Sequence, residues 1–124
     1  MSDNAAMLAG NLVADPELRF TPNGVQVASF RLAVTPRIRE EGGWRNGEPS
    51  FFRVNAWREL AVNVAESLGK GDRAVVVGRL RVRTWETSAG EQRSVVEVEA
   101  DEVGVSLKWA IARPQRAWKR ASAG

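Results

Sequence analysis

The sequence predicts an all-β fold with one short helix, arranged as a five-stranded Greek-key β-barrel. Apolar and polar residues alternate along several stretches that end in turn residues, which is the pattern of strands with one buried face. Only residues 59–68 space their apolar side chains four apart, as an amphipathic helix does. One helix between the third and fourth strands suits a partly open barrel, whereas a parallel α/β sheet would need several more helices.

Turn signals separate the first two expected strands. Residues 4–13 form an apolar first strand, and the pairs at 15–16 and the run at 21–24 are turn sequences. Within the second turn, Gly24 is expected to adopt a positive φ. Residues 25–35 alternate, and the residues expected to face the core are Ala28, Phe30, Leu32 and Val34.

The second half of the chain supplies a loop, a strand, the helix and a hairpin. Residues 36–50 are expected to form a long loop rich in Gly, Glu and Arg, and residues 51–57 a short strand. The helix of residues 59–68 follows and ends near a glycine. Residues 72–87 and 91–107 then form two long strands joined by a three-residue turn.

Composition excludes several kinds of chemistry. The 124 residues include no Cys and no His, which removes disulfides, thiol nucleophiles, thiolate metal sites and the commonest general base. We therefore expect no metal, no cofactor and no enzymatic activity. No apolar run approaches the ~18 residues of a membrane span, and residues 1–7 lack the regions of a signal peptide. A cytoplasmic protein is expected.

Positive charge is concentrated at the C-terminal end. Residues 1–103 carry 13 basic and 15 acidic side chains, whereas residues 104–124 carry five basic side chains and no acid. We expect residues 1–107 to form one domain and residues 108–124 a basic, flexible tail. The overall charge of +3 therefore does not by itself indicate nucleic acid, and the positions of the cations in the body of the chain matter more.

Residues 51–57 offer a face that could stack bases. One alternate set is apolar and is expected to face the core, namely Phe52, Val54 and Ala56. The other set carries two aromatic rings and a guanidinium group, namely Phe51, Arg53, Asn55 and Trp57. Such a set binds unpaired bases and phosphates. The pattern alone is equally compatible with both aromatic residues packing in the core.

The register of the last hairpin follows from its turn. A three-residue turn places Leu80 opposite Val98 and Val82 opposite Val96, which predicts a continuous core face. The same register places two arginines opposite two glutamates, with Arg81 facing Glu97 and Arg79 facing Glu99. We expect ordinary cross-strand ion pairs there, worth about 0–1 kcal/mol each.

Beyond those pairs, one exposed tryptophan lies between unpaired cations. The register sets Arg83 opposite Val95 and Trp85 opposite Arg93, with no acid to neutralise either arginine. Packing explains this arrangement poorly, whereas base stacking and phosphate binding explain it well. The expected loop repeats the theme with Arg37, Arg39, Trp44 and Arg45, although a solvated loop explains that pattern equally well.

Several short motifs run in one collinear order over about residues 5–107: Gly10-Asn11-Leu12, Asp15-Pro16-Glu17-Leu18-Arg19-Phe20, Pro22-Asn23-Gly24, Val54 with Trp57, Lys70-Gly71, Gly78-Arg79-Leu80, Arg83-Thr84-Trp85 and Val96-Glu97-Val98. In these motifs the chain resembles the bacterial single-stranded DNA-binding protein (SSB) family. Residues 35–38 and 64–68 look most like actinobacterial members.

The resemblance implies an OB fold that assembles as a homotetramer and binds single-stranded DNA in replication, recombination or repair, close to the nucleoid. The family's base-stacking positions fall on Ile38, Phe51, Trp57 and Trp85, and its phosphate-contacting positions on Arg19, Arg53, Lys70 and Arg83. At position 38 isoleucine has no ring to stack, and Trp44 nearby is a candidate replacement.

The complete set of predicted DNA-binding residues adds cations from the outward faces of the strands. It comprises Arg19, Arg31, Ile38, Trp44, Phe51, Arg53, Trp57, Lys70, Arg81, Arg83, Trp85 and Arg93.

The C-terminal end departs from the family. Full-length members carry a linker ending in an acidic peptide that recruits repair enzymes, whereas this chain ends in basic residues. We therefore expect either a short paralogue or a truncated chain, without that recruitment. Within the tail, Trp118 is a candidate for extra DNA contact and Trp109 for packing on a neighbouring subunit.

Three other functions stay open. A nuclease would need clustered carboxylates with two-metal spacing, and the acidic residues show no such spacing. A primosomal OB subunit that docks on replication proteins would also lack an acidic tail. RNA binding is the third, because stacking does not depend on the 2′-hydroxyl group.

Overall fold

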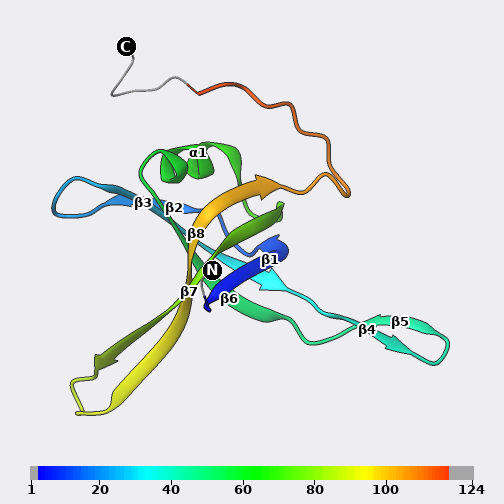
Figure 1. The fold of residues 1–124 in the computed structure, drawn as a ribbon, viewed down its shortest axis with the longest axis horizontal. Helices are drawn as coiled ribbons and strands as arrows, with labels where there is room; N and C mark the ends of the chain where they lie inside the picture. The colour runs from blue at the N-terminus through cyan, green and yellow to red at the C-terminus, as the bar shows by residue number, and fades with distance from the viewer. Residues whose placement is uncertain (1–2, 118–124) are drawn as a thin grey trace.

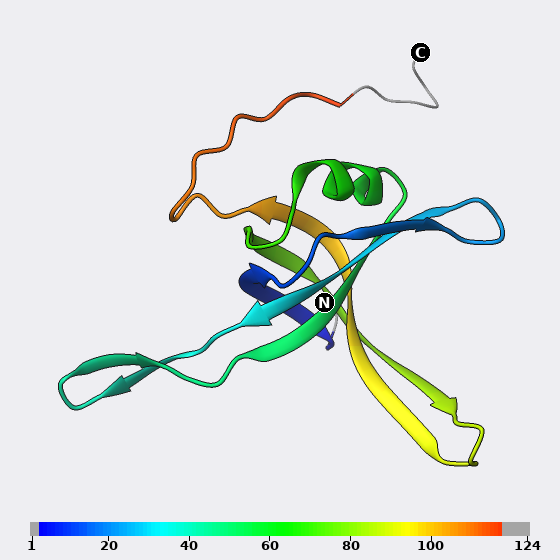
Figure 2. The same cartoon turned by 180° about the vertical axis from the view of Figure 1, so that it is seen from behind.

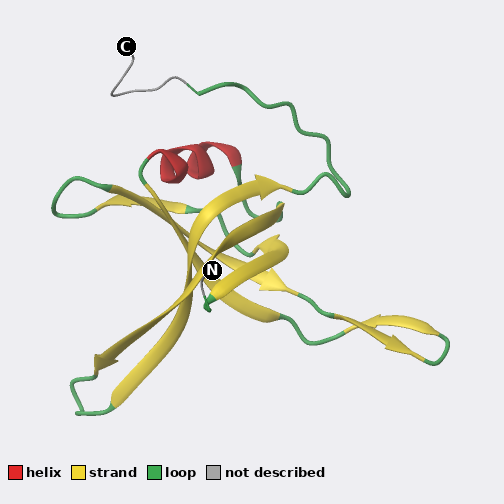
Figure 3. Cartoon of the chain, in the orientation of Figure 1, coloured by secondary structure: helices red, strands yellow, loops and turns green. Residues whose placement is uncertain are grey.

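A computed structural model describes residues 3–117 and is shown in Figure 1, with its strands and helix coloured in Figure 3. Along these residues the elements are β1 (Ala5–Leu12), β2 (Glu17–Phe20), β3 (Gln26–Val34), β4 (Arg37–Glu40), β5 (Gly43–Asn46), β6 (Ser50–Trp57), α1 (Glu59–Ser67), β7 (Arg73–Glu86) and β8 (Gln92–Val105).

A closed ring of five strands forms the body of the molecule. The sheet order is β1-β7-β8-β6-β3-β2, and β1 also pairs with β3. The ring closes where Asn11 and Leu12 lie opposite Ala33 and Leu32. Just before this junction, a Cβ built on Gly10 would stand 2.3 Å from the Ala33 carbonyl oxygen. Glycine is therefore required for the two backbones to approach so closely.

Side chains from every strand of the ring fill its interior. The alternation predicted for β3 and β6 is confirmed, because Phe30, Leu32, Val54 and Ala56 are buried. Removing this apolar surface from water is the main stabilising contribution. The core cluster consists of Leu12, Ala28, Phe30, Leu32, Val54, Ala56, Ala61, Val64, Leu68, Ala74, Val76 and Val98.

The helix covers one end of this core. Figures 1 and 2 show α1 lying across one end of the strand ring. The β7–β8 and β4–β5 hairpins extend away from the opposite end. Its apolar residues Ala61 and Val64 are buried, as is Leu68, which ends the helix in an extended conformation. Gly71 then turns the chain into β7 with φ of 90°. The predicted helix over residues 59–68 is thus confirmed to within one residue.

The five predicted strands are present, with ends within two residues of those expected. Gly24 has φ of 82°, and its amide donates to the Thr21 carbonyl oxygen at 2.8 Å, which confirms the predicted turn. Two details differ. Residues 17–20 add β2 to the edge of β3, and the expected loop over residues 36–50 contains the β4–β5 hairpin.

The predicted register of β7 and β8 is confirmed, but the core face predicted for their outer half is wrong. Leu80 lies opposite Val98 and Val82 opposite Val96. Val98 is fully buried, whereas Val82 is 63% exposed and both Leu80 and Val96 are also exposed. Figure 1 shows the cause, because the hairpin extends beyond the ring and, among residues 3–117, no other strand covers its outer half. Alternation predicts the side on which a residue lies but not whether that side is covered.

A bulge lies shortly before the point at which the hairpin leaves the ring. The pairing shifts between Val77, opposite Glu102, and Gly78, opposite Ala100. A Cβ on Gly78 would stand 2.2 Å from the Glu99 carbonyl oxygen. Such an irregularity increases the local twist and bends the strands, so Gly78 allows the hairpin to change direction.

Residues 106–117 contain no helix or strand. Within this segment the Trp109 ring lies near two cations, Arg73 at 5.2 Å and Lys108 at 5.1 Å from its centroid. The prediction for Trp118 concerns a residue outside those that the structure describes. Over residues 3–117 the single helix has nine residues, too few to cross a membrane.

Replacing Gly10 by alanine should destabilise the ring closure. The added methyl group would meet the Ala33 carbonyl oxygen, and relief of that overlap should lower the free energy of unfolding by about 1–3 kcal/mol. Denaturant unfolding measures the change. Gly104→Ala is the matched control, because nothing lies within 4 Å of its added Cβ. Equal stability of the two variants would contradict the closure argument.

Candidate nucleic-acid interface

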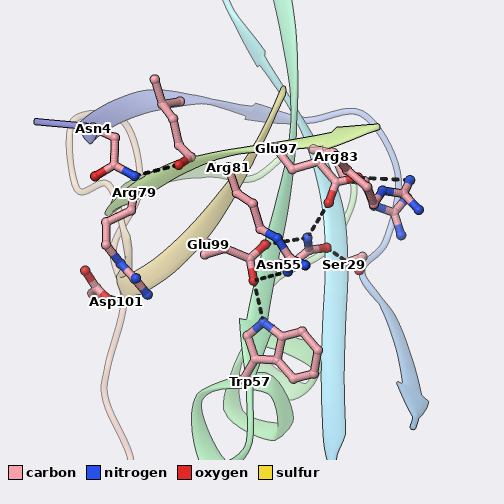
Figure 4. A network of polar contacts seen from close by, with 12 residues as sticks. Asn4, Ser29, Asn55, Trp57, Arg79, Arg81, Arg83, Glu97, Glu99 and Asp101 are labelled. Carbon is pink, nitrogen blue, oxygen red and sulfur yellow. Dashed lines mark hydrogen bonds and ion pairs between the residues drawn. The ribbon is translucent and has the colours of Figure 1, made fainter. Parts of the chain in front are cut away.

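The outward sides of β2, β3, β6, β8 and β7 share a continuous polar network, part of which is shown in Figure 4. It begins at β2, where Arg19 Nη1 donates to Ser29 Oγ at 3.1 Å. The Ser29 hydroxyl in turn donates to Asn55 Oδ1 on β6 at 2.7 Å. Both Ser29 and Asn55 are buried, so these bonds satisfy polar groups that water cannot reach.

Asn55 joins the network to two carboxylates of β8. Its amide Nδ2 donates to Glu97 Oε1 at 2.9 Å and to Glu99 Oε2 at 2.8 Å. The other Glu99 oxygen accepts from Trp57 Nε1 at 2.8 Å. Because one end of the Trp57 indole is held in this way, its ring has a fixed orientation on the surface.

Arginines approach the same two carboxylates from both neighbouring strands. Glu97 Oε2 lies 3.2 Å from Arg83 Nη2 and 3.7 Å from Arg53 Nε. Glu99 Oε1 lies 3.8 Å from Arg81 Nη1. All three arginine side chains remain about half exposed while Glu97 is buried. The arginine side chains therefore lie nearer the solvent than the carboxylates of Glu97 and Glu99 that they contact.

The ion pairs expected between directly opposed residues are wrong in their partners. Arg81 lies opposite Glu97, and Arg79 opposite Glu99. The side chains instead reach the acid two residues further along β8: Arg81 contacts Glu99, and Arg79 contacts Asp101 at 3.8 Å. Long side chains reach diagonal neighbours on a twisted antiparallel pair. Opposition in the ladder therefore does not determine which charges meet.

Ion pairs also correct the prediction that Arg83 and Arg93 are unpaired. Arg83 contacts Glu97, and Arg93 Nη2 donates to Glu91 Oε1 at 3.0 Å. The Arg93 pair joins residues two positions apart at the start of β8 and is exposed, so it is worth little. The Arg83 pair is part of the network, and its partner Glu97 is buried.

Three aromatic rings are accessible on this side of the protein. Phe51 is 48% exposed, Trp57 37% and Trp85 45%, so the alternative that these rings pack in the core is wrong. The Arg31 guanidinium carbon lies 4.4 Å from the Phe51 ring centroid, and that of Arg83 lies 5.4 Å from the Trp85 centroid. Each of these two rings is thus paired with a cation.

The β4–β5 hairpin carries two of the predicted residues on opposite sides. Ile38 lies opposite Arg45, and Arg39 lies opposite Trp44. Since consecutive residues of a strand point to opposite faces, Trp44 cannot replace the side chain of Ile38 on one face. Trp44 is exposed, and Arg37 and Arg39 lie 5.6 and 5.9 Å from its centroid. On the other face Arg45 pairs with Glu40.

The structure thus brings most of the predicted residues together and leaves some apart. Arg53, Trp57, Arg81 and Arg83 share the two carboxylates. Lys70 lies elsewhere, in the turn between α1 and β7, where its amide donates to Asp15 Oδ1 at 2.8 Å. Arg19 begins the network through Ser29, and the remaining members extend the surface from it: Arg31 and Phe51 beside it, Trp85 and Arg93 on the β7–β8 hairpin, and Ile38 and Trp44 on the β4–β5 hairpin.

Sequence reasoning did not identify the connecting role of Ser29, Asn55, Glu97 and Glu99. The one available signal was a polar residue, Asn55, between buried neighbours of a short strand. The parallel pairing of β6 with β8 places it opposite Glu99. No local pattern indicates that pairing, because these residues are more than 40 positions apart.

A small closed ring of strands with one helix across its end, and with a polar, aromatic outer face, defines an OB-fold protein. The chain belongs to the single-strand binding protein family, whose model matches residues 3–106.

Known proteins similar to this chain include single-stranded DNA-binding proteins of several actinobacteria. The single-stranded DNA-binding protein of Mycolicibacterium smegmatis is 55% identical over 117 residues, covering 93% of this chain and 71% of that protein. That of Corynebacterium glutamicum is 57% identical over 118 residues, covering 94% and 52%. The crystal structure of the small single-stranded DNA-binding protein from Streptomyces coelicolor superposes with a TM-score of 0.74 at 38% identity, covering 86% of this chain and 97% of that one.

Truncating Asn55 should destabilise the fold. Asn55→Ala removes two hydrogen bonds to carboxylates and leaves Glu97 with fewer partners, so the free energy of unfolding should fall by roughly 3 kcal/mol. Denaturant unfolding measures this loss. Asn63→Ala on the helix is the control and should change stability by less than about 0.5 kcal/mol. A small effect of Asn55→Ala would show that the network contributes little to folding.

Proposed function

We propose that the protein binds single-stranded DNA without sequence preference and has no enzymatic activity. The observation that carries the proposal is that accessible aromatic side chains and half-exposed arginine side chains lie together on one outer face of the strand ring. Every base has a flat face that stacks on an aromatic ring, so this surface would accept any sequence. Membership of the single-strand binding protein family and the names of the relatives support the same activity.

Bases would stack on Phe51, Trp57 and Trp85, and guanidinium groups would follow the phosphates. Stacking on an aromatic side chain contributes about 1–3 kcal/mol per base. The phosphate contacts we propose come from Arg19, Arg31, Arg53, Arg81 and Arg83, with Lys70 and Arg93 further out. Trp44 would contribute a further platform from the β4–β5 hairpin, through the ring that Arg37 and Arg39 flank. Ile38, on the opposite face, would offer apolar contact only.

We further propose a homotetramer. Over residues Ala5–Gly10 the only strand paired with β1 is β7, within the part of the chain that the structure describes. On the outer face of these two strands Met7, Val75 and Val77 are exposed. An unpaired strand edge beside an apolar patch favours pairing with a second copy. The family resemblance sets the expected number of subunits at four.

The cellular setting we propose is the bacterial cytoplasm near the nucleoid, where single-stranded DNA arises in replication, recombination and repair. The family membership supports this placement. Residues 108–124 carry only basic charges, so we propose that they do not recruit repair enzymes as an acidic peptide would. The same residues would add electrostatic attraction to DNA.

Binding to labelled oligo-dT tests the activity. We expect the affinity to fall steeply as salt increases, because neutralised phosphates release condensed counterions. Trp85→Ala should weaken binding by about 1–3 kcal/mol, and Trp85→Phe should restore much of that loss because it keeps a ring. Fluorescence anisotropy measures both. If the wild-type protein fails to bind oligo-dT at low salt, the proposed function is wrong.

Competition separates single-stranded DNA from the related ligands. Unlabelled duplex DNA should compete poorly, because its bases are stacked inside the helix and unavailable to Phe51, Trp57 or Trp85. Single-stranded RNA of equal length shows whether the surface discriminates the sugar. Stronger competition by RNA than by DNA would favour an RNA-binding protein instead.

Self-association is tested at the β1–β7 face. Met7→Glu places a charge in the exposed apolar patch and should lower the assembly state in analytical ultracentrifugation, because a charge is costly to bury in an interface. Ala14→Glu adds the same charge at an exposed loop position and should leave the assembly unchanged. A wild-type protein that sediments as a monomer would contradict the proposed tetramer.

A further inference from the structure

Glu97 is an unusual residue to find beneath a surface for DNA. It is only 4% exposed, and burial of a carboxylate is costly unless it is paired and hydrogen-bonded. Its Oε1 accepts from Asn55, but among the described residues Oε2 accepts no hydrogen bond of good geometry. Two guanidinium nitrogens approach Oε2 at 3.2 and 3.7 Å.

The position of Oε2 is that of an anion bound between two arginines. Arg53 lies on β6 and Arg83 on β7, on either side of β8, and both point toward this oxygen. Phosphate oxygens bind guanidinium groups in the same manner. Glu97 therefore gives the two half-exposed arginines a charged partner when no phosphate is present.

From this arrangement we infer that Glu97 is an internal competitor for phosphate. It positions Arg53 and Arg83, and the DNA backbone must draw both side chains away from it. The inference rests on the proposed binding of single-stranded DNA and adds that this carboxylate limits the affinity. Half-exposed arginine side chains can turn outward to a phosphate without rearranging the backbone.

Other charged groups around Glu97 do not replace this role. On its own strand Glu99 lies two residues away and contacts Arg81. On β7 Arg81 lies opposite Glu97 in the ladder, but its ion pair is with Glu99. On β6 the neighbours are Arg53 and the neutral Asn55. Arg53 and Arg83 are thus the cations that depend on Glu97.

Glu97→Gln tests the inference, because the two side chains are almost the same size and Gln keeps the acceptor for Asn55. Removing the competing charge should raise the affinity for oligo-dT by roughly tenfold. It should also steepen the dependence of log affinity on log salt by about 0.7 for each additional phosphate engaged. Fluorescence anisotropy over a salt series measures both quantities.

Two controls separate competition from a change in overall charge or fold. Glu66→Gln removes one negative charge from an exposed position on α1 and should alter the affinity far less. In an Arg53→Gln/Arg83→Gln background Glu97→Gln should lose most of its effect, because the two released cations are no longer there. A gain that persists in this background would overturn the inference.

The result that contradicts the inference is a folded Glu97→Gln protein whose affinity is unchanged or lower. If that variant does not fold, Glu97→Asp decides, because the shorter side chain draws the carboxylate back from Arg53 and Arg83 and should raise the affinity by a smaller factor. Unchanged or lower affinity of folded Glu97→Asp would then overturn it. Wild-type protein that does not bind oligo-dT would refute the proposed function itself, which is a separate outcome.

Discussion

The parallel pairing of β6 with β8 is the contact on which the rest of the structure depends. Three residue pairs form it, with Val54 opposite Val98 in the middle. Those two valines are fully buried in the ring. Their sequence neighbours point outward and place Asn55 beside Glu97 and Glu99. Because side chains alternate along a strand, this short ladder positions both apolar residues of the interior and the polar network of the outer face.

The polar network gives the outer face a defined geometry before any ligand binds. Asn55 and Trp57 are held by carboxylates, and Arg53 and Arg83 share one carboxylate oxygen. Ordering long side chains in advance reduces the entropy lost on binding. The same carboxylates oppose phosphate, so preorganisation and weaker attraction come from one set of groups. A protein whose DNA must be both protected and released would benefit from this balance.

Aromatic side chains paired with arginine occur at three separate places, one on the strand ring and one on each of two hairpins. On the strand ring, Arg31 lies over Phe51. On the hairpins, Arg83 lies near Trp85 (β7–β8) and Arg37 near Trp44 (β4–β5). Figures 1 and 2 show the two hairpins extending away from the ring in different directions. This distribution extends the proposed binding surface well beyond the ring, which suits a long flexible strand.

Local patterns in the sequence determined the strands, the helix, the inward and outward sides of β3 and β6, and the register of β7 with β8, because alternation and turn length act between near neighbours. The exposure of Val82, the partners of Arg81 and Arg83, and the face occupied by Trp44 were decided only by the tertiary structure. These features depend on how far a hairpin extends past the ring, how strongly it twists and which distant strand lies beside it. None of these is a property of a short stretch of residues.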